Sequence, residues 1–345
     1  MRRRSLLGLG ALAALIWPSW RVAARPFTDS AGRQVDIPGP VRRVFPAGPP
    51  ASVTLFTVAP EKLLGWTRSP SEAARPFIPK RYAALPEIGR LTGRGNTVNL
   101  ENVVKLAPDL VLDVGNTTEA YVSLANRVQA QTHIPDALIA GHLDQTARTL
   151  RILGGLLDVH ERAEVLARYA EAVLSEARQQ VANFPPAERP TLYIARGPHG
   201  LESTVAGSIG SEVVDLIGAR NVVGKEAGSH TIVDVLPEQI LAWQPDVILT
   251  TDRRFHGSIR TDPVWRQLKA VQAGHVHFVP DLPFSWLDDP PAPNRLIGLL
   301  WLGKLLYPTS FRQDIRAETR RFYALFYQQE PSDAQLDGIL ADRPA

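Results

Sequence analysis

Two stretches of this chain repeat each other, and this duplication constrains the fold more than any other feature of the sequence. Residues 101–112 align without a gap on residues 238–249. Each copy opens with a glutamate, Glu101 or Glu238, in a short helical pattern, passes through a Pro-Asp turn and ends in an apolar strand. Two copies of one helix-turn-strand unit predict two similar α/β lobes.

A long helical pattern lies between the two copies. Neither Gly nor Pro interrupts residues 159–184, and the pair Pro185-Pro186 then ends any helix. At about 1.5 Å per residue, such a helix would be roughly 36 Å long. The apolar residues recur at three- and four-residue spacings, typical of one buried helix face: Val165, Leu166, Tyr169, Val173, Ala177 and Val181.

Short strands alternate with helices and short loops along most of the chain, which favours parallel sheets. The predicted fold class is α/β: two lobes with central, mostly parallel sheets flanked by helices and joined by one long α-helix. The tail from Glu330 shows no clear pattern, and we expect it to be frayed. The predicted organisation is a signal peptide (1–24), an N-terminal lobe (25–142), linking helices (143–184), a C-terminal lobe (185–308), and a closing helix with the tail (309–345).

The first residues indicate export. Arg2-Arg3-Arg4 precede an apolar run from Leu6 to Trp17, and Val22-Ala23-Ala24 supply small residues for cleavage, as in a secretory signal peptide. The run is too short for the roughly 20 residues of a membrane-spanning helix. The paired arginines also match a twin-arginine signal, so both export routes stay open.

The charge balance changes when the signal peptide is removed. Residues 1–24 hold four arginines and no acids, so the formal charge falls from +3 to about −1. The basic character of the whole chain therefore gives no reason to expect a nucleic-acid partner. The chain has no Cys, which excludes thiolate metal sites and Cys nucleophiles and suits an exported bacterial protein without disulfides. We expect a soluble monomer in the periplasm.

Four motifs in order give the chain a family resemblance. They are Thr28–Arg33 followed by Arg43-Val44, the segment Asn99–Val111, the segment Val235–Ile248, and the long helical pattern between the two copies. With them the chain resembles, over residues 26–328, the periplasmic substrate-binding proteins of ABC importers in which a single helix links two lobes. This class serves ferric siderophores, cobalamin, haem and some metal ions or oxyanions. The stretch from Pro283 to Leu302 looks like the sub-branch grouped with iron-complex and molybdate or tungstate receptors.

The resemblance implies a role for the two repeat glutamates. In this family one exposed glutamate on each lobe pairs with arginines of the permease dimer in the inner membrane, and Glu101 and Glu238 occupy the matching positions. Two separated carboxylates fix the orientation of a receptor on a dimeric partner. A second interpretation is that both only begin a helix, where the helix dipole favours a carboxylate.

If the lobes face each other, the loops after the strands line the cleft between them. These loops are rich in arginine and poor in carboxylates, with Asp252 the main acid, which predicts an anionic ligand because the guanidinium fork matches carboxylate and oxyanion geometry. The candidate ligand-binding arginines are Arg68, Arg94, Arg196 and Arg254, and the cleft loops also hold Arg90 and Arg253.

Three further side chains are candidates for the same cleft. His199 and His256 lie in loops of the second lobe, where they could contact a metal complex or an oxyanion, although either could be an ordinary surface histidine. Trp286, in a proline-bounded loop, is either a rigid wall against an organic chelator or a core residue packed on Trp301 or Phe284. No Tyr falls in the loops assigned to the cleft, so an axial haem ligand would have to be a histidine.

These expectations combine into a non-catalytic receptor that captures an anionic iron chelate of the siderophore type and delivers it to a membrane permease. Molybdate or tungstate, haem and cobalamin stay open as alternative ligands. We expect no cofactor and no metal site made of protein ligands alone, since the first-lobe loops offer no His. An exported enzyme acting on a chelate is the alternative of a different class, but Gly-x-Ser-x-Gly, His-Glu-x-x-His, Walker and dinucleotide motifs are absent.

Overall fold

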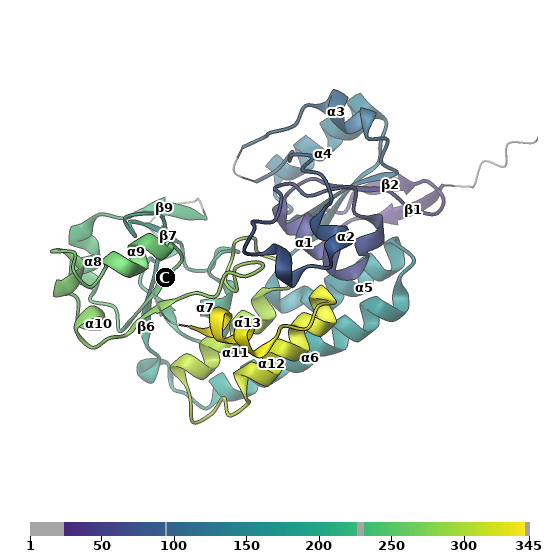
Figure 1. Cartoon of the computed structure of the whole chain (residues 1–345). Coiled ribbons are helices and arrows are strands. Elements are labelled where there is room, and N and C mark those ends of the chain that lie inside the picture. The colour runs from purple at the N-terminus through teal and green to yellow at the C-terminus, as the bar shows by residue number, and fades with distance from the viewer. Residues whose placement is uncertain (1–23, 94, 226–230, 342–345) are drawn as a thin grey trace, which may run out of the picture.

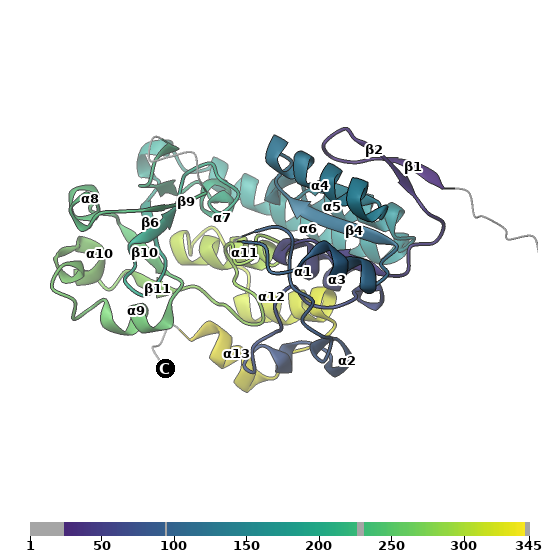
Figure 2. The same cartoon turned by 90° about the horizontal axis from the view of Figure 1, so that it is seen from above.

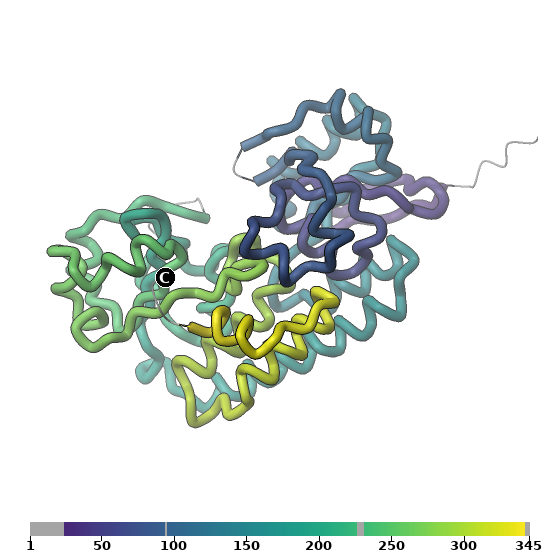
Figure 3. The backbone as a smooth tube through the Cα atoms, viewed as in Figure 1, coloured from purple at the N-terminus to yellow at the C-terminus, as the bar shows by residue number. Residues whose placement is uncertain are grey.

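The computed structural model describes residues 24–93, 95–225 and 231–341. All but the last residue of the expected signal peptide, and also Arg94, lie outside these ranges. The chain forms two α/β lobes that are joined along one side by a layer of helices (Figure 1). The backbone trace shows the same division, with the lobes spread apart on the side opposite this layer (Figure 3).

The N-terminal lobe is built on a three-stranded parallel sheet in the order β3-β4-β5. The strands are β3 (Val44–Pro46), β4 (Leu110–Gly115) and β5 (Asp136–Ala140). Leu110 and Leu112 of β4 join the core under α1 (Pro49–Val58), while Val111 joins the core under α3 (Leu100–Lys105) and α4 (Glu119–Thr132). Since side chains alternate along a strand, Asp113 lies on the same face as Val111.

The C-terminal lobe has a four-stranded parallel sheet in the order β11-β10-β6-β8. Its strands are β6 (Thr191–Ala195), β8 (Arg220–Asn221), β10 (Val247–Thr250) and β11 (Val276–Phe278). A separate antiparallel pair, β7 (Glu202–Thr204) with β9 (Ile232–Asp234), lies next to β6. The helices of this lobe are α7 (Glu212–Leu216), α8 (Pro237–Trp243), α9 (Arg253–Ser258) and α10 (Lys269–Gln272).

The repeat has the predicted structure in both lobes. The first copy forms α3 and β4, and the second copy forms α8 and β10. Both strands have a neighbour on each side in their sheets. The fold class expected from the sequence, two lobes with mostly parallel sheets flanked by helices, is therefore confirmed.

The helical layer carries the connection between the lobes. Helix α6 (His160–Ala182) follows α5 (Thr146–Leu156) and packs along it and along α11 (Arg295–Leu306). Its 23 residues make it about 34 Å long, close to the predicted length. The prediction that Val165 lies on the buried face was wrong. Val165 is 53% exposed, because the buried face runs through Ala163, Leu166 and Ala170 instead.

The closing segment differs from the prediction. Helix α12 (Ile315–Phe322) continues into a π-helical turn, η7 (Tyr323–Tyr327), and the tail expected to be frayed forms α13 (Asp333–Leu340). The Ser332 hydroxyl accepts a hydrogen bond from the Gln335 backbone N–H, a capping arrangement that stabilises the start of α13.

The remaining elements are short. The strands β1 (Arg25–Thr28) and β2 (Gln34–Ile37) form an antiparallel hairpin around the turn at Asp29, whose carboxylate accepts hydrogen bonds from the backbone of Ala31 and Arg33. The short helices are η1 (Pro60–Lys62), η2 (Arg75–Phe77), α2 (Lys80–Ala83), η3 (Leu143–Gln145), η4 (Pro186–Glu188) and η6 (Trp265–Gln267).

One large core links both lobes to the helical layer. Buried residues of β4, α6, β6 and α11 belong to a single apolar cluster. Viewed from above, α11 lies between the C-terminal sheet and the helices of the N-terminal lobe (Figure 2). A shared core of this kind favours small lobe movements over wide hinge opening. Within the described ranges, every helix falls short of the length and apolar character that crossing a bilayer requires.

Candidate functional site

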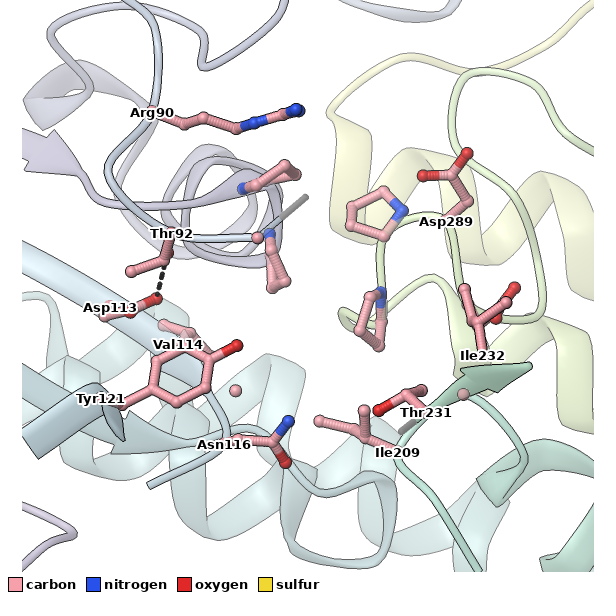
Figure 4. Close-up of a pocket in the computed structure, with 18 of the residues that line it drawn as sticks. Arg90, Thr92, Asp113, Val114, Asn116, Tyr121, Ile209, Thr231, Ile232 and Asp289 are labelled. Carbon is pink, nitrogen blue, oxygen red and sulfur yellow. Dashed lines mark hydrogen bonds between the residues drawn. The ribbon is translucent and has the colours of Figure 1, made fainter. Parts of the chain in front are cut away.

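A cavity of about 390 Å³ lies between the lobes, at the carboxyl ends of the parallel strands. In the close-up, Arg90, Thr92 and Tyr121 come from the N-terminal lobe and face Thr231, Ile232 and Asp289 across the cavity (Figure 4). Loops after β3 and β4 build the first wall, and the loop after β6 with residues 288–291 builds the second.

Close backbone contact shapes the first wall. Residues 90–93 pass over the start of α1, where a Cβ atom on Gly48 would lie 2.4 Å from the Thr92 hydroxyl oxygen. A side chain at position 48 would therefore force Thr92 to move. Pro49 and Pro50 follow as the first residues of α1 and line the cavity, so these two positions offer no backbone N–H to a ligand.

Asp113 is the acidic group of this wall and is 4% exposed. The Thr92 hydroxyl donates to its Oδ1 over 3.3 Å (Figure 4). Burial raises the pKa of Asp113 to about 7, although this hydrogen bond and one from the Val114 backbone favour the charged form. Burial and the nearby Asp113 carboxyl also raise the pKa of Tyr121. At neutral pH the Asp113 carboxyl is therefore partly protonated, and the Tyr121 hydroxyl keeps its proton.

The second wall holds a buried ion pair. Arg196 follows β6, and its Nη1 donates to both carboxylate oxygens of Asp288, at 2.5 and 2.7 Å. Both side chains are largely buried. Burial disfavours the guanidinium cation, but the attraction of Asp288 outweighs it and raises the pKa of Arg196. Burial also raises the pKa of Asp288, and the contact with Arg196 opposes that shift. The short contact is that of an ion pair in which Asp288 offsets much of the positive charge of Arg196.

The structure brings together part of the predicted ligand-binding set. Arg68 and Arg196 line the cavity together with Arg90, whose Nε donates to the Gly95 carbonyl over 3.1 Å. Whether the predicted arginines contact a ligand stays a prediction. His199 and Arg254 are exposed and lie outside the cavity lining, and Arg94 is outside the described residues.

Two further predicted side chains are buried in the core, outside the cavity lining. For Trp286 this is the core alternative that the sequence left open. His256 is 1% exposed because its Nδ1 lies 2.8 Å from the Thr250 hydroxyl and its ring packs on Phe278. Trp286 is fully buried and packs edge-on against Trp301. Asp252 is also not a cleft carboxylate: it caps α9 by accepting a hydrogen bond from the Phe255 backbone.

Sequence reasoning missed the acidic and phenolic groups of the cavity: Asp113, Tyr121, Asp288 and Asp289. The loops assigned to the cleft hold no tyrosine, but Tyr121 reaches the cavity from α4, a helix that had not been assigned to it. Asp113 did leave a signal. It interrupts an apolar strand that was expected to end at Leu112 but continues to Gly115.

The two repeat glutamates lie on the surface, outside the cleft. Glu101 is in the first turn of α3 and Glu238 in the first turn of α8, and both are exposed. Each of these helices lies at the end of its lobe, away from α6 (Figure 1).

The fold, the cavity between the lobes and the helical connection define a class of two-lobed binding proteins. A family model described as "Periplasmic binding protein" matches residues 77–282, and the chain belongs to this family. It is accordingly a substrate-binding protein of an ABC import system. Its relatives are substrate-binding proteins and not enzymes.

Individual relatives support this assignment. An ABC transporter solute binding protein from Sulfurospirillum deleyianum shares 28% identity with a TM-score of 0.84, covering 92% of this chain and 99% of that one. The molybdate-bound periplasmic protein MolA of Haemophilus influenzae has a TM-score of 0.73 at 20% identity, covering 89% and 99% of the two chains. The haem uptake protein IsdE of Staphylococcus aureus is 24% identical, covering 66% of this chain and 78% of its own.

Proposed function

We propose that this protein captures a small anionic ferric chelate of the siderophore type in the bacterial periplasm and hands it to an ABC permease. The observation that carries the proposal is the set of guanidinium groups on the cavity wall, Arg68, Arg90 and Arg196. Asp288 offsets Arg196, and burial raises the pKa of Asp113 to about 7, so Asp113 carries only part of a negative charge at neutral pH. The described lining therefore holds three arginines against Asp288, Asp289 and a partly protonated Asp113. This excess favours a ligand with net negative charge.

The size of the cleft favours a chelate over a bare oxyanion. The main cavity, of about 390 Å³, adjoins a second cavity of about 360 Å³, and the two share lining residues. Each is large enough for a small organic ligand, since such pockets typically start at about 300 Å³. A tetrahedral oxyanion of five heavy atoms would leave most of this space to water.

The lack of two backbone N–H donors at the start of α1 also favours a chelate over a small oxyanion. A small oxyanion is held by several converging N–H groups, and helix N-termini are a common source of them. Here Pro49 and Pro50 remove two of those donors. The arginines, which reach further into the cavity, are better suited to the carboxylate or hydroxamate oxygens on the surface of a larger complex.

Haem is disfavoured by the tyrosine in the cleft. Haem iron needs an axial protein ligand, and a tyrosine binds ferric iron as the deprotonated phenolate. Tyr121 lines the cavity, but burial and Asp113 raise its pKa, so forming the phenolate there costs more free energy than at an exposed tyrosine. The two histidines considered for this role, His199 and His256, are outside the cavity lining.

Delivery to the permease would use Glu101 and Glu238. Their exposed positions on α3 and α8 give each lobe one carboxylate at its end (Figure 1). Two such charges on a rigid molecule suit a dimeric partner with basic residues, because they orient the encounter. Residues 1–24 would direct export to the periplasm.

A ligand panel tests the proposal. The exported protein is titrated with ferric citrate, ferric hydroxamates, molybdate, tungstate, haemin and cobalamin, followed by tryptophan fluorescence and calorimetry. We expect saturable binding of a ferric chelate with a dissociation constant of about 1 μM or lower, equivalent to about −8 kcal/mol. Binding of molybdate or tungstate alone, or of haemin alone, would contradict the proposed ligand.

A further inference from the structure

Asp113 is a buried acid on the wall of the cavity that, in the proposed function, holds an anion. It is 4% exposed and lines the cavity near the end of β4. Its Oδ1 accepts a hydrogen bond from the Thr92 hydroxyl, whereas its Oδ2 is buried and has no hydrogen-bond partner among the described residues. A buried carboxylate needs cations or several donors to keep its charge, and otherwise it retains its proton. The charge of Asp113 is therefore sensitive to what enters the cavity.

A second buried acid lies beside Asp113 in the sheet. In the parallel register of β4 and β5, Asp136 pairs with Val111, so Asp113 and Asp136 lie diagonally on one face. Both line the same closely packed space under Leu124 and Val128 of α4. Burial, and next the Asp113 carboxyl, raise the pKa of Asp136. Neighbouring buried carboxylates repel each other, so the pair retains a proton to a higher pH than two separate acids would.

The elements packed around the two acids bring little positive charge to Asp113. From the hairpin of β1 and β2, Arg33 donates to the Asp136 backbone carbonyl, and its charge partly opposes the rise in the pKa of Asp136. The Nε of Arg33 also donates to the buried Asp29 carboxylate at 2.9 Å. From α4, Tyr121 lies beside Asp113 (Figure 4). Arg33 is thus engaged with Asp29 and Asp136, and Tyr121 adds no positive charge.

The remaining charged groups face Asp113 from the cavity. They are Arg68, Arg90, Arg196, Asp288 and Asp289. Arg90 lies on the same wall as Asp113, Asp289 lies on the opposite wall (Figure 4), and Asp288 is paired with Arg196. An anion drawn to the arginines therefore comes close to the Asp113 carboxyl. Two negative charges in one poorly hydrated cavity repel each other strongly, and a proton on Asp113 removes this repulsion.

We propose that Asp113 links anion capture to a proton: its carboxyl takes up a proton when an anionic chelate enters the cavity and releases it when the chelate leaves. This inference rests on the proposed function and adds a regulation of the same site. A bound anion raises the pKa of Asp113 above its value of about 7 in the empty protein. The affinity is therefore highest below about pH 7 and falls as the pH rises through the range between the two pKa values.

An isosteric substitution isolates this proton. Asp113→Asn keeps the shape of the side chain and an oxygen that accepts from Thr92, but it cannot be charged. Asp136→Asn makes the same substitution on the neighbouring strand, outside the cavity lining, and is the matched control. Ferric citrate is titrated into each protein between about pH 6 and pH 8, followed by calorimetry. The ionisation of ferric citrate itself affects all three proteins equally, so the ratio of their dissociation constants reports on the protein.

We expect the dissociation constant of the parent, divided by that of Asp113→Asn, to rise by about tenfold from pH 6 to pH 8. Asp136→Asn should keep the pH dependence of the parent, displaced to lower pH because a repelling carboxyl is gone. A ratio for Asp113→Asn that stays constant would overturn the proton link and leave the proposed function standing, because ferric citrate would still bind. Absence of binding at every pH would overturn both together.

Proton uptake gives a second, independent readout. The heat of binding is measured at pH 7 in phosphate and in Tris, whose ionisation enthalpies differ, and the difference in heat counts the protons exchanged. The parent should take up about half a proton more than Asp113→Asn, because about half of the Asp113 carboxyls are already protonated in the empty protein at this pH. Circular dichroism checks that both variants are folded. Equal proton exchange by the parent and Asp113→Asn would contradict the assignment to Asp113.

Discussion

At the scale of single residues, the two predicted arginines that line the cavity differ in what they can offer. Arg196 is held by Asp288 at 2.5 Å, so much of its charge is already compensated. Arg68 is exposed at the boundary of both cavities, and within the described part of the chain no carboxylate forms an ion pair with it. We infer that Arg68 supplies the larger electrostatic attraction for an incoming anion. Arg196 is held in place by Asp288 and mainly shapes the cavity.

Replacing Arg68 by alanine should therefore weaken ferric citrate by about tenfold, the loss expected for a hydrogen bond to a charged group. The stability of the protein should hardly change, because Arg68 is a surface residue without a buried partner. Calorimetric titration measures the affinity. Arg254→Ala is the matched control, since Arg254 is exposed and lies outside both cavity linings. Equal effects of the two substitutions would show that only the overall charge matters.

At the scale of elements, the duplicated helix-turn-strand unit gives each lobe the same two features. Its strand ends at the cleft, and its helix presents a glutamate at the end of the lobe. An exposed apolar residue accompanies each glutamate, Val104 on α3 and Leu236 just before α8. Burying such a side chain in an interface contributes about 1.5 kcal/mol or more, so these pairs suit a contact surface better than an isolated helix cap.

Charge reversal distinguishes docking from capping. Glu101→Lys together with Glu238→Lys should abolish transport of a ferric chelate into cells, because both contacts with the permease would become repulsive. Affinity for the ligand should not change, since both positions are remote from the cavities. Uptake of radioactive iron measures transport, and Glu188→Lys, at another exposed glutamate, controls for added positive charge. Normal uptake by the double variant would rule out docking through these residues.

At the scale of the whole molecule, a buried polar cluster joins the lobes beneath the cleft. Glu212 of the C-terminal lobe accepts hydrogen bonds from Arg295 Nη1 at 2.5 Å and from the Leu143 backbone at 2.8 Å. His142 Nδ1 lies 2.6 Å from the same carboxylate. Arg295 is 1% exposed and also donates to the Gly141 carbonyl of the N-terminal lobe. One carboxylate and one guanidinium thus fix the relative position of the two lobes.

Glu212→Gln should lower the free energy of unfolding by about 3–5 kcal/mol, because it leaves the Arg295 charge buried without its counter-ion. Urea unfolding followed by circular dichroism measures the change. Glu188→Gln makes the same chemical substitution on the surface and should stay within about 0.5 kcal/mol of the parent. An unchanged unfolding midpoint for Glu212→Gln would show that the cluster does not stabilise the contact between the two lobes.

The sequence by itself determined the elements whose pattern is local. The duplication at residues 101–112 and 238–249 and the periodicity of α6 both appear in the structure close to where the sequence predicts them. Helix and strand periods are encoded within a few neighbouring residues, so they can be read without knowing what packs on them. Even here the exposed Val165 shows the limit, since the helices that pack on α6, among them α5 and α11, select its buried face.

Only the tertiary structure decided which side chains meet at the cleft. Arg196 and Asp288 are 92 residues apart in the chain, and Glu212 and Arg295 are 83 apart. No local pattern records such pairings. Trp286 illustrates the physical reason: its loop could have faced solvent or core, and the gain from burying a large aromatic ring turned it inward. Loop direction follows from packing between distant segments, and the ligand site is made of loops.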